Sequence, residues 1–500
     1  MQAEQLLSDR DAESGVVQAF RPARTADLPP SRLQRFGEPR RSSSLQWPAS
    51  GRGKVRTTLC HALSAVMAAL AVCIATVVPT RAQVAPAAVP AVIILKAARL
   101  IDGRGGAPTA PAMVRVDGER ITAVGSTIAV PQGARVIDLG SATLLPGLID
   151  LHTHLTGQRS VHWEDVLTKT TPGHDALWGA RNALATLRAG FTTVRDMGPT
   201  WPFVDVDLRD AIEAGAVPGP RMMVAGNYVS STGGAGDARQ FSIYVDVPLV
   251  KNLADGPDEI VKAVRTNFKN GADFIKILAT GAVLSKGIPP GAQQYSDEEI
   301  QAAVTEATRW GRQVAAHAHG ASGIIASIKA GVRTVDHGSF LNDEAIALLQ
   351  ASNRRVFYVP TLYTADAIEN EGAANGIPAS ERERNRTIRE TEYGGFKRAL
   401  AAGIPIGFAT DAMVIEHGDN AKECQVRHQL GESPMACIVS ATSLNAEIMG
   451  WSDRVGSVEP GKFADLAAVP GDPLQDITQL QKVGFVMKGG QVVRDDLVRR

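Results

Sequence analysis

The chain has 500 residues, which is too long for a minimal domain and suits one large domain with a smaller appendage. Hydrophobic residues make up 44% of it and charged residues 21%, as in an ordinary globular protein. Lys plus Arg and Asp plus Glu both number 52, so no net charge attracts nucleic acid or an anionic membrane. The composition therefore argues against a polyelectrolyte partner. We expect a small-molecule partner and no nucleic acid.

The first 54 residues differ in composition from the rest of the chain. Arginine, proline and serine are frequent among them, and the apolar residues show little periodicity. A segment of this kind buries too little apolar surface to fold. Residues 1–54 are therefore predicted to be disordered, or to result from an over-extended translation start.

Residues 55–82 have the features of a secretory signal peptide. An apolar run follows the basic residues Lys54 and Arg56, and the small residues Thr80 and Ala82 stand at a cleavage position. A membrane anchor is the alternative, because about 20 apolar residues can span a bilayer. We favour the signal peptide. We expect a periplasmic or secreted mature protein that begins after Ala82 and has no stable membrane association once the signal is removed.

Two of the four cysteines, Cys60 and Cys73, lie in the predicted signal peptide. Cys424 and Cys437 remain in the mature chain and can pair in an oxidising compartment, but the sequence leaves their pairing open. No CxxC motif occurs, so thiolates are not the expected metal ligands.

Both ends of the mature chain are predicted to be rich in β-strands. Short apolar stretches alternate with turns such as Asp117-Gly118 and Lys488-Gly489-Gly490. The predicted strands cover Val92–Leu95, Met113–Val116, Ile121–Val124 and Arg135–Leu139 near the start, and Leu466–Val469, Gly484–Lys488 and Gln491–Arg494 near the end. We expect residues 83–145 and 453–500 to form one small β-sandwich together.

The middle of the chain, residues 146–452, alternates between strands and amphipathic helices. The predicted helices include Pro257–Asn270, Asp297–Trp310 and Asn342–Ala351, and Ser296 supplies an N-cap to the second. The predicted strands are Gly147–His152, Thr192–Asp196, Arg221–Ala225, Phe274–Leu278, Gln313–His317, Thr334–His337, Val356–Thr361 and Ile406–Thr410. Eight strands in alternation with helices predict an α/β fold, a (β/α)8 TIM barrel.

Side chains that bind metals follow these strands at their carboxyl ends, where barrel active sites lie. His152 and His154 are two positions apart, so both point to the same side of a strand. The other positions, each at the end of a later strand, are Lys276, His317, His337 and Asp411. Any one of them has an ordinary structural explanation; a lysine, for example, can extend its ammonium group to solvent. Their joint occurrence at five strand ends predicts a metal site.

This set of residues resembles the ligand pattern of the amidohydrolase superfamily. Its binuclear members have His-x-His after the first strand, a carboxylated lysine after the fourth, histidines after the fifth and sixth, and an aspartate after the eighth. The flanking segments are also similar, in Leu145–Asp150 before the first motif and in Gly456–Leu466 before the closing strands. The resemblance extends from about Val92 to Arg494.

The resemblance implies two divalent metal ions, with zinc as the default for a site rich in histidine. It assigns one metal to His152, His154, Lys276 and Asp411, and the other to Lys276, His317 and His337. N6-carboxylysine at Lys276 is implied as the bridge between them. Two metals lower the pKa of a shared water, so that hydroxide is available near neutral pH. Asp411 is the implied catalytic residue, which moves a proton from that water to the leaving nitrogen.

Three further residues are candidates for substrate binding. Arg195 and Tyr228 follow the second and third predicted strands, and both side chains can bind a substrate carboxylate. His319 lies two positions after His317 and is a rival metal ligand by the same alternation. The family's order places the ligand first, so we expect His319 beside the ligands, as a candidate for substrate contact.

Three motifs are similar to the branch that holds Xaa-Pro dipeptidases and ochratoxin-type amidases: Lys276–Gly281, Tyr295–Ile300 and Ala316–Gly320. This branch cleaves the amide bond between an acyl group and a C-terminal amino acid. We expect a small-molecule amide or dipeptide substrate of this class, and a homo-oligomer. The alternatives are a lactonase or esterase, or a cyclic-amide hydrolase similar to imidazolonepropionase. Lys276 argues against the last, because the mononuclear enzymes lack a carboxylated lysine.

Overall fold

The computed structural model describes residues 92–159, 163–237, 241–242, 244–245, 253–285 and 288–497. They belong to one compact unit, Ala85–Arg500. The predicted extension (residues 1–54) and the predicted signal peptide (residues 55–82) lie outside the described residues. Within the described part of the chain, no helix combines the length and the apolar character needed to cross a bilayer.

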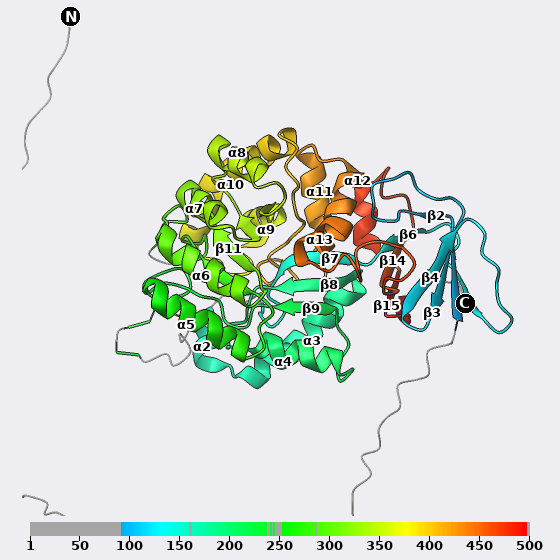
Figure 1. The fold of residues 1–500 in the computed structure, drawn as a ribbon, viewed down its shortest axis with the longest axis horizontal. Helices are drawn as coiled ribbons and strands as arrows, with labels where there is room; N and C mark the ends of the chain where they lie inside the picture. The colour runs from blue at the N-terminus through cyan, green and yellow to red at the C-terminus, as the bar shows by residue number, and fades with distance from the viewer. Residues whose placement is uncertain are drawn as a thin grey trace, which may run out of the picture. The chain divides into compact units, whose positions relative to one another are not determined.

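Strands from both ends of the chain form two sheets (Figure 1). One sheet has the order β4-β3-β1-β5, and the other, β16-β15-β14-β6-β2, combines strands from the two ends. Their bounds are β1 Val92–Ala97, β2 Arg99–Leu100, β3 Ala112–Asp117, β4 Arg120–Gly125, β5 Arg135–Asp138, β6 Thr143–Pro146, β14 Leu466–Val469, β15 Phe485–Lys488 and β16 Gln491–Asp495. All seven predicted strands of these regions are confirmed, while β2 and β6 were not predicted.

Residues of the two sheets pack in one apolar core. In β3 every second residue is buried, and Val114 and Val116 belong to this inward set. They pack in the same cluster as Leu466 of β14 and Phe485 of β15. The alternation therefore separates a core face from a half-buried face in β3.

Parallel strands form two further sheets in the middle of the chain, β7-β8-β9 and β10-β11-β12-β13. Their bounds are β7 Leu148–Thr153, β8 Phe191–Asp196, β9 Arg221–Val224, β10 Ile275–Leu278, β11 Val314–Ala318, β12 Thr334–His337 and β13 Phe357–Val359. Seven of the eight predicted strands are thus present, with ends within two residues of the prediction.

Helices follow most of these strands and lie around them in Figure 1. They are α2 Trp163–Lys169, α3 Pro172–Arg188, α4 Val204–Glu213, α5 Gly256–Lys269, α6 Asp297–Arg309, α7 Ala321–Ala330, α8 Asp343–Ala351, α9 Leu362–Glu371, α10 Ala379–Ala401, α11 Lys422–Gln429, α12 Pro434–Val439 and α13 Asn445–Met449, with a π-helical turn at Ser440–Leu444 and a 3-10 turn at Ile477–Lys482. The three predicted helices are confirmed as α5, α6 and α8. Ser296 caps α6 in a capping box with Glu299, as its sequence predicts.

The eighth predicted strand, residues 406–410, is not a regular strand, and that prediction is wrong. It pairs with its neighbours at only a few positions, where Gly407 N donates to the Tyr358 carbonyl and the Phe408 carbonyl accepts from Leu151 N. Other backbone groups of the segment bond to side chains. Phe408 N donates to Asn445 Oδ1, and Thr410 N donates to Asp150 Oδ1. The Gly407 carbonyl accepts a hydrogen bond from Arg427. The apolar pattern therefore identified a buried extended segment but not its hydrogen bonding.

Isolated bridges connect the two parallel sheets. On one side Val229 forms a parallel bridge with Ile277 of β10. On the other, the segment 406–412 lies between β13 and β7, with bridges from Tyr358 to Ile406 and from Thr153 to Ala412. The carboxyl ends of β7 and of this segment are therefore neighbours.

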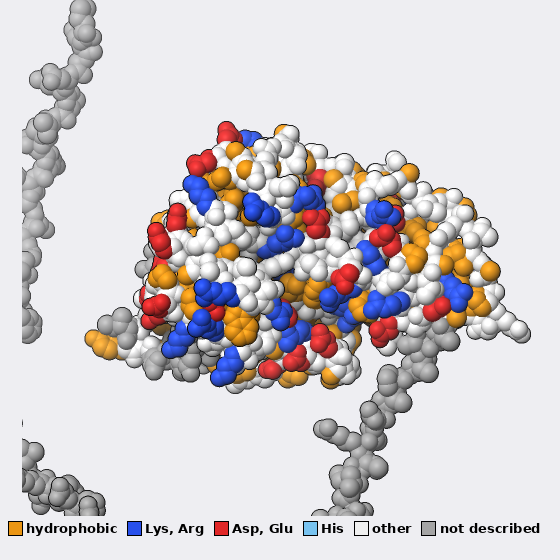
Figure 2. Space-filling model, viewed as in Figure 1, with side chains coloured by type: hydrophobic (Ala, Val, Ile, Leu, Met, Phe, Trp, Pro, Cys, Tyr) orange, Lys and Arg blue, Asp and Glu red, His pale blue; other side chains and the backbone are white. Residues whose placement is uncertain are grey.

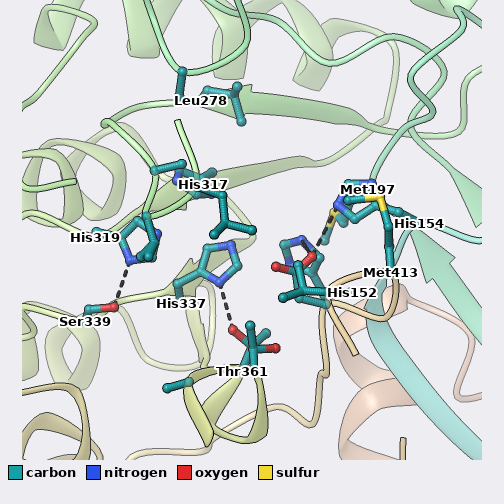
Figure 3. A pocket seen from close by; sticks show the side chains of 18 of the residues that line it. His152, His154, Met197, Leu278, His317, His319, His337, Ser339, Thr361 and Met413 are labelled. Atoms are coloured by element: carbon teal, nitrogen blue, oxygen red, sulfur yellow. Dashed lines mark hydrogen bonds and ion pairs between the residues drawn. The ribbon is translucent and has the colours of Figure 1, made fainter. Parts of the chain in front are cut away.

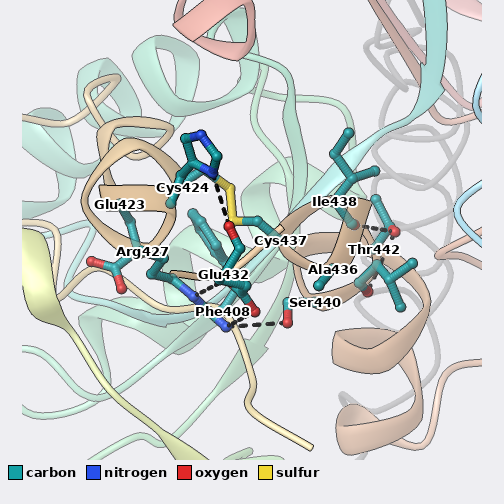
Figure 4. The surroundings of a disulfide bond; sticks show 12 residues. Phe408, Glu423, Cys424, Arg427, Glu432, Ala436, Cys437, Ile438, Ser440 and Thr442 are labelled. Atoms are coloured by element: carbon teal, nitrogen blue, oxygen red, sulfur yellow. Dashed lines mark hydrogen bonds and ion pairs between the residues drawn. A yellow bond between two sulfur atoms is a disulfide. The ribbon is translucent and has the colours of Figure 1, made fainter. Parts of the chain in front are cut away.

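Cys424 of α11 and Cys437 of α12 form a buried disulfide, with 5.9 Å between their Cα atoms (Figure 4). Beside it, Arg427 forms two charge-assisted hydrogen bonds with Glu432, of 2.7 and 2.9 Å. The structure thus decides the pairing that the sequence left open. The disulfide and the ion pair together hold α11 and α12 behind the segment 406–410.

Charged side chains of both signs are interspersed over the face shown in Figure 2. Elsewhere among the described residues, charged side chains pair within one helix or between helices; Arg386 of α10, for example, lies 3.0 Å from Glu369 and 2.9 Å from Glu383. Exposed pairs of this kind contribute less than about 1 kcal/mol each. The charges on this face therefore bear on solubility more than on the stability of the fold.

Candidate metal centre and its pocket

A first group of possible ligands lies where β7 meets the segment 406–412. His152 Nε2 and His154 Nε2 lie 3.5 and 3.4 Å from Oδ1 of Asp411. One ligand atom from each of the three residues falls within 4.8 Å of the others. The predicted His-x-His motif and the predicted aspartate are therefore in one place.

The hydrogen bonds of these two histidines direct their Nε2 atoms toward Asp411. His154 Nδ1 lies 2.6 Å from the Gly198 carbonyl, which can only accept, so Nδ1 donates there and Nε2 is the nitrogen directed toward Asp411. His152 Nδ1 lies 3.3 Å from Oδ2 of Asp336. Burial and the charge of Lys276 lower the pKa of His152 to about 4, so its ring is neutral at pH 7.

A second group consists of His317 and His319 of the β11 end and His337 of the β12 end. Each has a fixed partner: His317 Nε2 lies 3.2 Å from the Gly281 carbonyl, and His337 Nδ1 lies 2.8 Å from Oγ1 of Thr361. His319 Nδ1 lies 2.7 Å from Oγ of Ser339 (Figure 3). Burial lowers the pKa of all three rings, which makes them neutral donors.

The two groups adjoin one another, since the rings of His152 and His337 have centroids 4.8 Å apart. Lys276, on β10, is 2% exposed, and its Nζ lies 3.5 Å from His152 Nε2. Burial lowers the pKa of Lys276. The structure therefore brings together all six predicted ligands and adds His319 to them.

Asp336 was not predicted, yet it lies beneath this site. Its Oδ2 is 3.3 Å from both Lys276 Nζ and His152 Nδ1, and its Oδ1 is 3.4 Å from Nη2 of Arg195. Burial raises the pKa of Asp336, but the neighbouring cations outweigh burial and hold it below the usual range. The only signal in the sequence was an aspartate inside a buried strand, which is costly unless it is paired.

Arg195 does not lie where the sequence analysis expected it. The residue is 1% exposed and does not line the pocket. It donates to the Leu151 carbonyl at 2.8 Å and to Oγ1 of Thr334 at 3.0 Å, in addition to its contact with Asp336. Its donors are therefore directed into the interior between the parallel strands, away from any substrate carboxylate.

The two ligand groups form the floor of a pocket of about 250 Å³. Tyr228 and His319, both predicted to contact substrate, line it. We call the surrounding apolar surface the pocket wall; its main residues are Leu278, Val283, Leu284, Ile368, Ile388 and Met413. Asn385 and Glu392 of α10 are polar exceptions in it, and the sequence analysis did not find them.

Two of the floor residues have strained backbones. His337 and Asp411 are in the left-handed region, with φ of 68° and 56°. Such conformations cost about 1–3 kcal/mol at residues other than glycine and are frequent at functional sites. The surrounding structure therefore holds these two side chains in positions that the backbone alone does not favour.

The donor set of the floor fits divalent transition metals. Burial lowers the pKa of His152, His317, His319 and His337. Hydrogen bonds to protein atoms fix the ring orientation of His154, His317 and His337. Imidazole and carboxylate are ligands that zinc and its neighbours accept.

A model of the amidohydrolase family matches residues 143–493 of the chain. The protein belongs to the amidohydrolase family. The match spans the parallel strands, the floor residues and the last strands of the shared sheet. This amidohydrolase is accordingly a hydrolase that acts on amide bonds.

Similar proteins narrow the family further. Ochratoxinase of Aspergillus niger is 30% identical over 437 residues, which cover 81% of this amidohydrolase and 87% of ochratoxinase. The crystal structure of a Xaa-Pro dipeptidase with bound methionine in the active site has a TM-score of 0.75 and 34% identity, and covers 81% of this chain and 100% of that one. A prolidase complexed with N-methylphosphonate-L-proline has a TM-score of 0.75 and 30% identity, over 81% of this chain and 100% of that one. The branch suggested by the motifs is thereby confirmed.

Proposed function

We propose that this amidohydrolase cleaves the amide bond to the C-terminal amino acid of a dipeptide or an N-acyl amino acid. The observation that carries the proposal is the meeting of two ligand groups around Lys276, on the floor of a pocket with an apolar wall. The similarity to a Xaa-Pro dipeptidase and to ochratoxinase supports the same bond type. The pocket volume suits a small molecule rather than a folded protein.

We assign one divalent metal, with zinc expected, to His152, His154, Lys276 and Asp411, and a second to Lys276, His317 and His337. Two such ions, when bound, lower the pKa of a water molecule and polarise the amide carbonyl. Two observations support this assignment: His154 Nε2 faces Asp411, and the hydrogen bond of His317 Nε2 leaves its Nδ1 for a metal.

N6-carboxylysine at Lys276 is part of the proposal. Carbon dioxide adds to a neutral amine, and burial lowers the pKa of Lys276, which favours that form. The product keeps one N–H, which can still donate to Asp336 Oδ2, now 3.3 Å from Nζ. The added carboxylate changes a repulsive cation into an anion beside the histidines.

Asp411 is the residue to which we assign proton transfer. Its carboxylate lies within 3.5 Å of both histidines of the first group and lines the pocket. We propose that it accepts the proton of the attacking water and delivers it to the departing amine nitrogen. An amine needs this proton to leave, whereas a phenol or phosphate leaving group needs it less.

We further propose that the parallel strands close into a (β/α)8 barrel over residues 146–452, with the other two sheets as a β-sandwich from residues 83–145 and 453–500. The isolated bridges on both sides of the parallel sheets and the single core of the other two support this arrangement. The active site then lies at the carboxyl ends of the barrel strands.

We also propose that the protein acts outside the cytoplasm after cleavage near Gln83. The buried disulfide between Cys424 and Cys437 supports an oxidising compartment. Amino-terminal sequencing of the protein exported by its native host tests this proposal. A mature terminus within residues 1–54 contradicts it.

A release assay on the purified zinc-loaded protein tests the proposed activity. Dipeptides and N-acyl amino acids are compared with lactones, hydantoins and phosphotriesters at equal concentrations. We expect the best amide to exceed every other class in kcat/KM. A lactone, hydantoin or phosphotriester that exceeds all amides by about tenfold or more, equivalent to 1.4 kcal/mol, contradicts the substrate assignment.

A further inference from the structure

Helix α10 presents one face to the pocket. Asn385, Ile388 and Glu392 are three, four and seven positions apart, which places them on one side of the helix, and all three line the pocket. Ile388 belongs with the apolar residues of the wall. Glu392 is the acidic residue that α10 contributes to this surface, and the proposed reaction does not use it.

A hydrogen bond holds the carboxyl group of Glu392 in place, but little positive charge lies close enough to balance a negative charge on it. The residue is 4% exposed, and its Oε1 accepts a hydrogen bond of 3.2 Å from Oγ of Ser339. Ser339 also contacts His319 Nδ1 at 2.7 Å, so the carboxyl group lies close to the second histidine group. Among the described residues, no Lys, Arg or His forms an ion pair with Glu392.

The electrostatic surroundings of Glu392 favour an incoming cation. Burial, together with the nearby carboxylates of Glu423 and Asp366, raises the pKa of Glu392 to about 8, although the hydrogen bond with Ser339 acts in the opposite direction. Asp366 already has Arg389 and Tyr393 as partners. A buried carboxylate without a counter-ion is costly, so a positive group that enters the pocket gains by pairing with it.

Asn385 offers a second acceptor on the same face. Its Nδ2 donates to the Ala365 carbonyl at 2.9 Å, which leaves its carbonyl oxygen as an acceptor. The carboxylate of Glu392 matches a group with N–H donors and a positive charge, and the Asn385 oxygen, two helical turns away, can accept from a different donor of the same substrate. A primary ammonium group has both properties, and a neutral acyl group has neither.

From this we infer that Glu392 is a specificity-determining residue that binds the protonated α-amino group of the substrate's acyl residue. The inference rests on the proposed function. It narrows the substrate class to dipeptides with a free amino terminus, in preference to N-acyl amino acids without an amine. The apolar residues Leu278, Ile368 and Ile388 then accommodate the side chain of the amino-terminal residue.

Two substrates that differ only at the amine test this inference. The zinc-loaded full chain is assayed with phenylalanyl-proline and with 3-phenylpropanoyl-proline, which has a hydrogen in place of the amino group. The variants are Glu392→Gln, which keeps the shape of the side chain, and Glu390→Gln as a matched control. Glu390 is an exposed residue of the same helix.

We expect the wild-type protein and Glu390→Gln to prefer the amine by at least tenfold in kcat/KM. Glu392→Gln should reduce that preference to within about threefold of unity. Its turnover of 3-phenylpropanoyl-proline should stay within about threefold of wild type, which also shows that the variant is folded. A tenfold preference corresponds to about 1.4 kcal/mol of free energy.

Three outcomes contradict the inference in different ways. Equal turnover of the two compounds by the wild-type protein, or a preference that survives in Glu392→Gln, overturns the role of Glu392 and leaves the proposed function intact. Faster turnover of the compound without the amine overturns the substrate class. Turnover of neither compound, together with failure of every other amide in the release assay, contradicts the proposed function and this inference with it.

Discussion

The floor and the wall of the pocket are built in different ways. Floor residues lie at the carboxyl ends of parallel strands or after the segment 406–410, and several of the histidines have one ring nitrogen held by a protein partner. Wall residues come mainly from α9, α10 and the segment after β10, and most of them are apolar. The difference teaches that the strands, together with the extended segment before Asp411, position the ligand groups here, whereas helices and loops provide most of the apolar lining.

The largest expected effect comes from removing the centre of the floor. Lys276→Ala should lower kcat/KM for amides by about a thousandfold or more, because it removes the proposed bridge between the metals. Metal analysis should show fewer than two ions per chain. The control is Lys269→Ala, since Lys269 is an exposed residue at the end of α5. An active Lys276→Ala with unchanged metal content rules out the binuclear assignment.

The second prediction concerns the support of the wall. The disulfide encloses a sequence separation of 13 residues, and Glu423, next to Cys424, accepts a hydrogen bond of 2.7 Å from Tyr363 N in α9. Replacing both cysteines by alanine should lower the free energy of unfolding by about 2–4 kcal/mol.

Thermal unfolding with and without reductant measures this effect. The wild-type protein should lose stability in reductant, and the double variant should be indifferent to it. Metal content should stay the same in both, because the cysteines do not touch the floor. A wild-type melting temperature that reductant leaves unchanged would mean that the disulfide does not form.

The third prediction concerns Asp336, which contacts two residues of the floor. Asp336→Asn should weaken metal binding by about 10–100-fold, because Asp336 orients His152 and faces Lys276. Competition with a chelator measures the affinity, and Asp343→Asn, at an exposed aspartate of α8, is the control. Equal affinities for the two variants would show that Asp336 acts only on the stability of the fold.

The smallest expected effect is a change in how the stability of the fold depends on pH, and it comes from Glu392 in the pocket wall. With a folded-state pKa of about 8, against 4.5 normally, Glu392 holds a proton that the unfolded chain has lost between these values. Its contribution to stability therefore falls as the pH rises through this window. The free energy of unfolding of Glu392→Gln, relative to that of the wild type, should therefore rise by at least about 1 kcal/mol between pH 5 and pH 8.

Urea denaturation at several pH values checks this prediction. The difference in the free energy of unfolding between variant and wild type should grow steadily with pH. Parallel curves would show that Glu392 titrates near its ordinary value and has a counter-ion. The same measurement on Glu390→Gln should give a constant difference, because that side chain is exposed.

Sequence reasoning succeeded on the floor because strand periodicity is short and regular. His152 and His154 had to share a face, and the carboxyl ends of parallel strands had to lie together. Lys276 stood out because a buried amine is costly. These inferences depend on the spacing and type of residues along the chain. One sequence was therefore sufficient to predict that the residues share a site.

The residues of the wall, and those that support the floor, could not be predicted from the sequence, for physical reasons. Glu392 is one of many charged residues in α10, and only tertiary packing turns it inward. Arg195 and Asp336 pair across β8 and β12, which no local pattern relates. The segment 406–410 looked like a strand because it is apolar and extended, but part of its backbone bonds to the side chains of Asn445 and Asp150.

The pairing of β6 with β14 has a consequence for folding during translation. Pro146 lies opposite Leu466, so the ribosome makes one of these strands long before the other. Until the last strands emerge, β6 has an open edge, with backbone groups that any other chain can bind. This sheet can therefore assemble only when translation is almost complete. A nascent chain that stops before residue 466 keeps an unpaired edge on β6, to which other chains can bind.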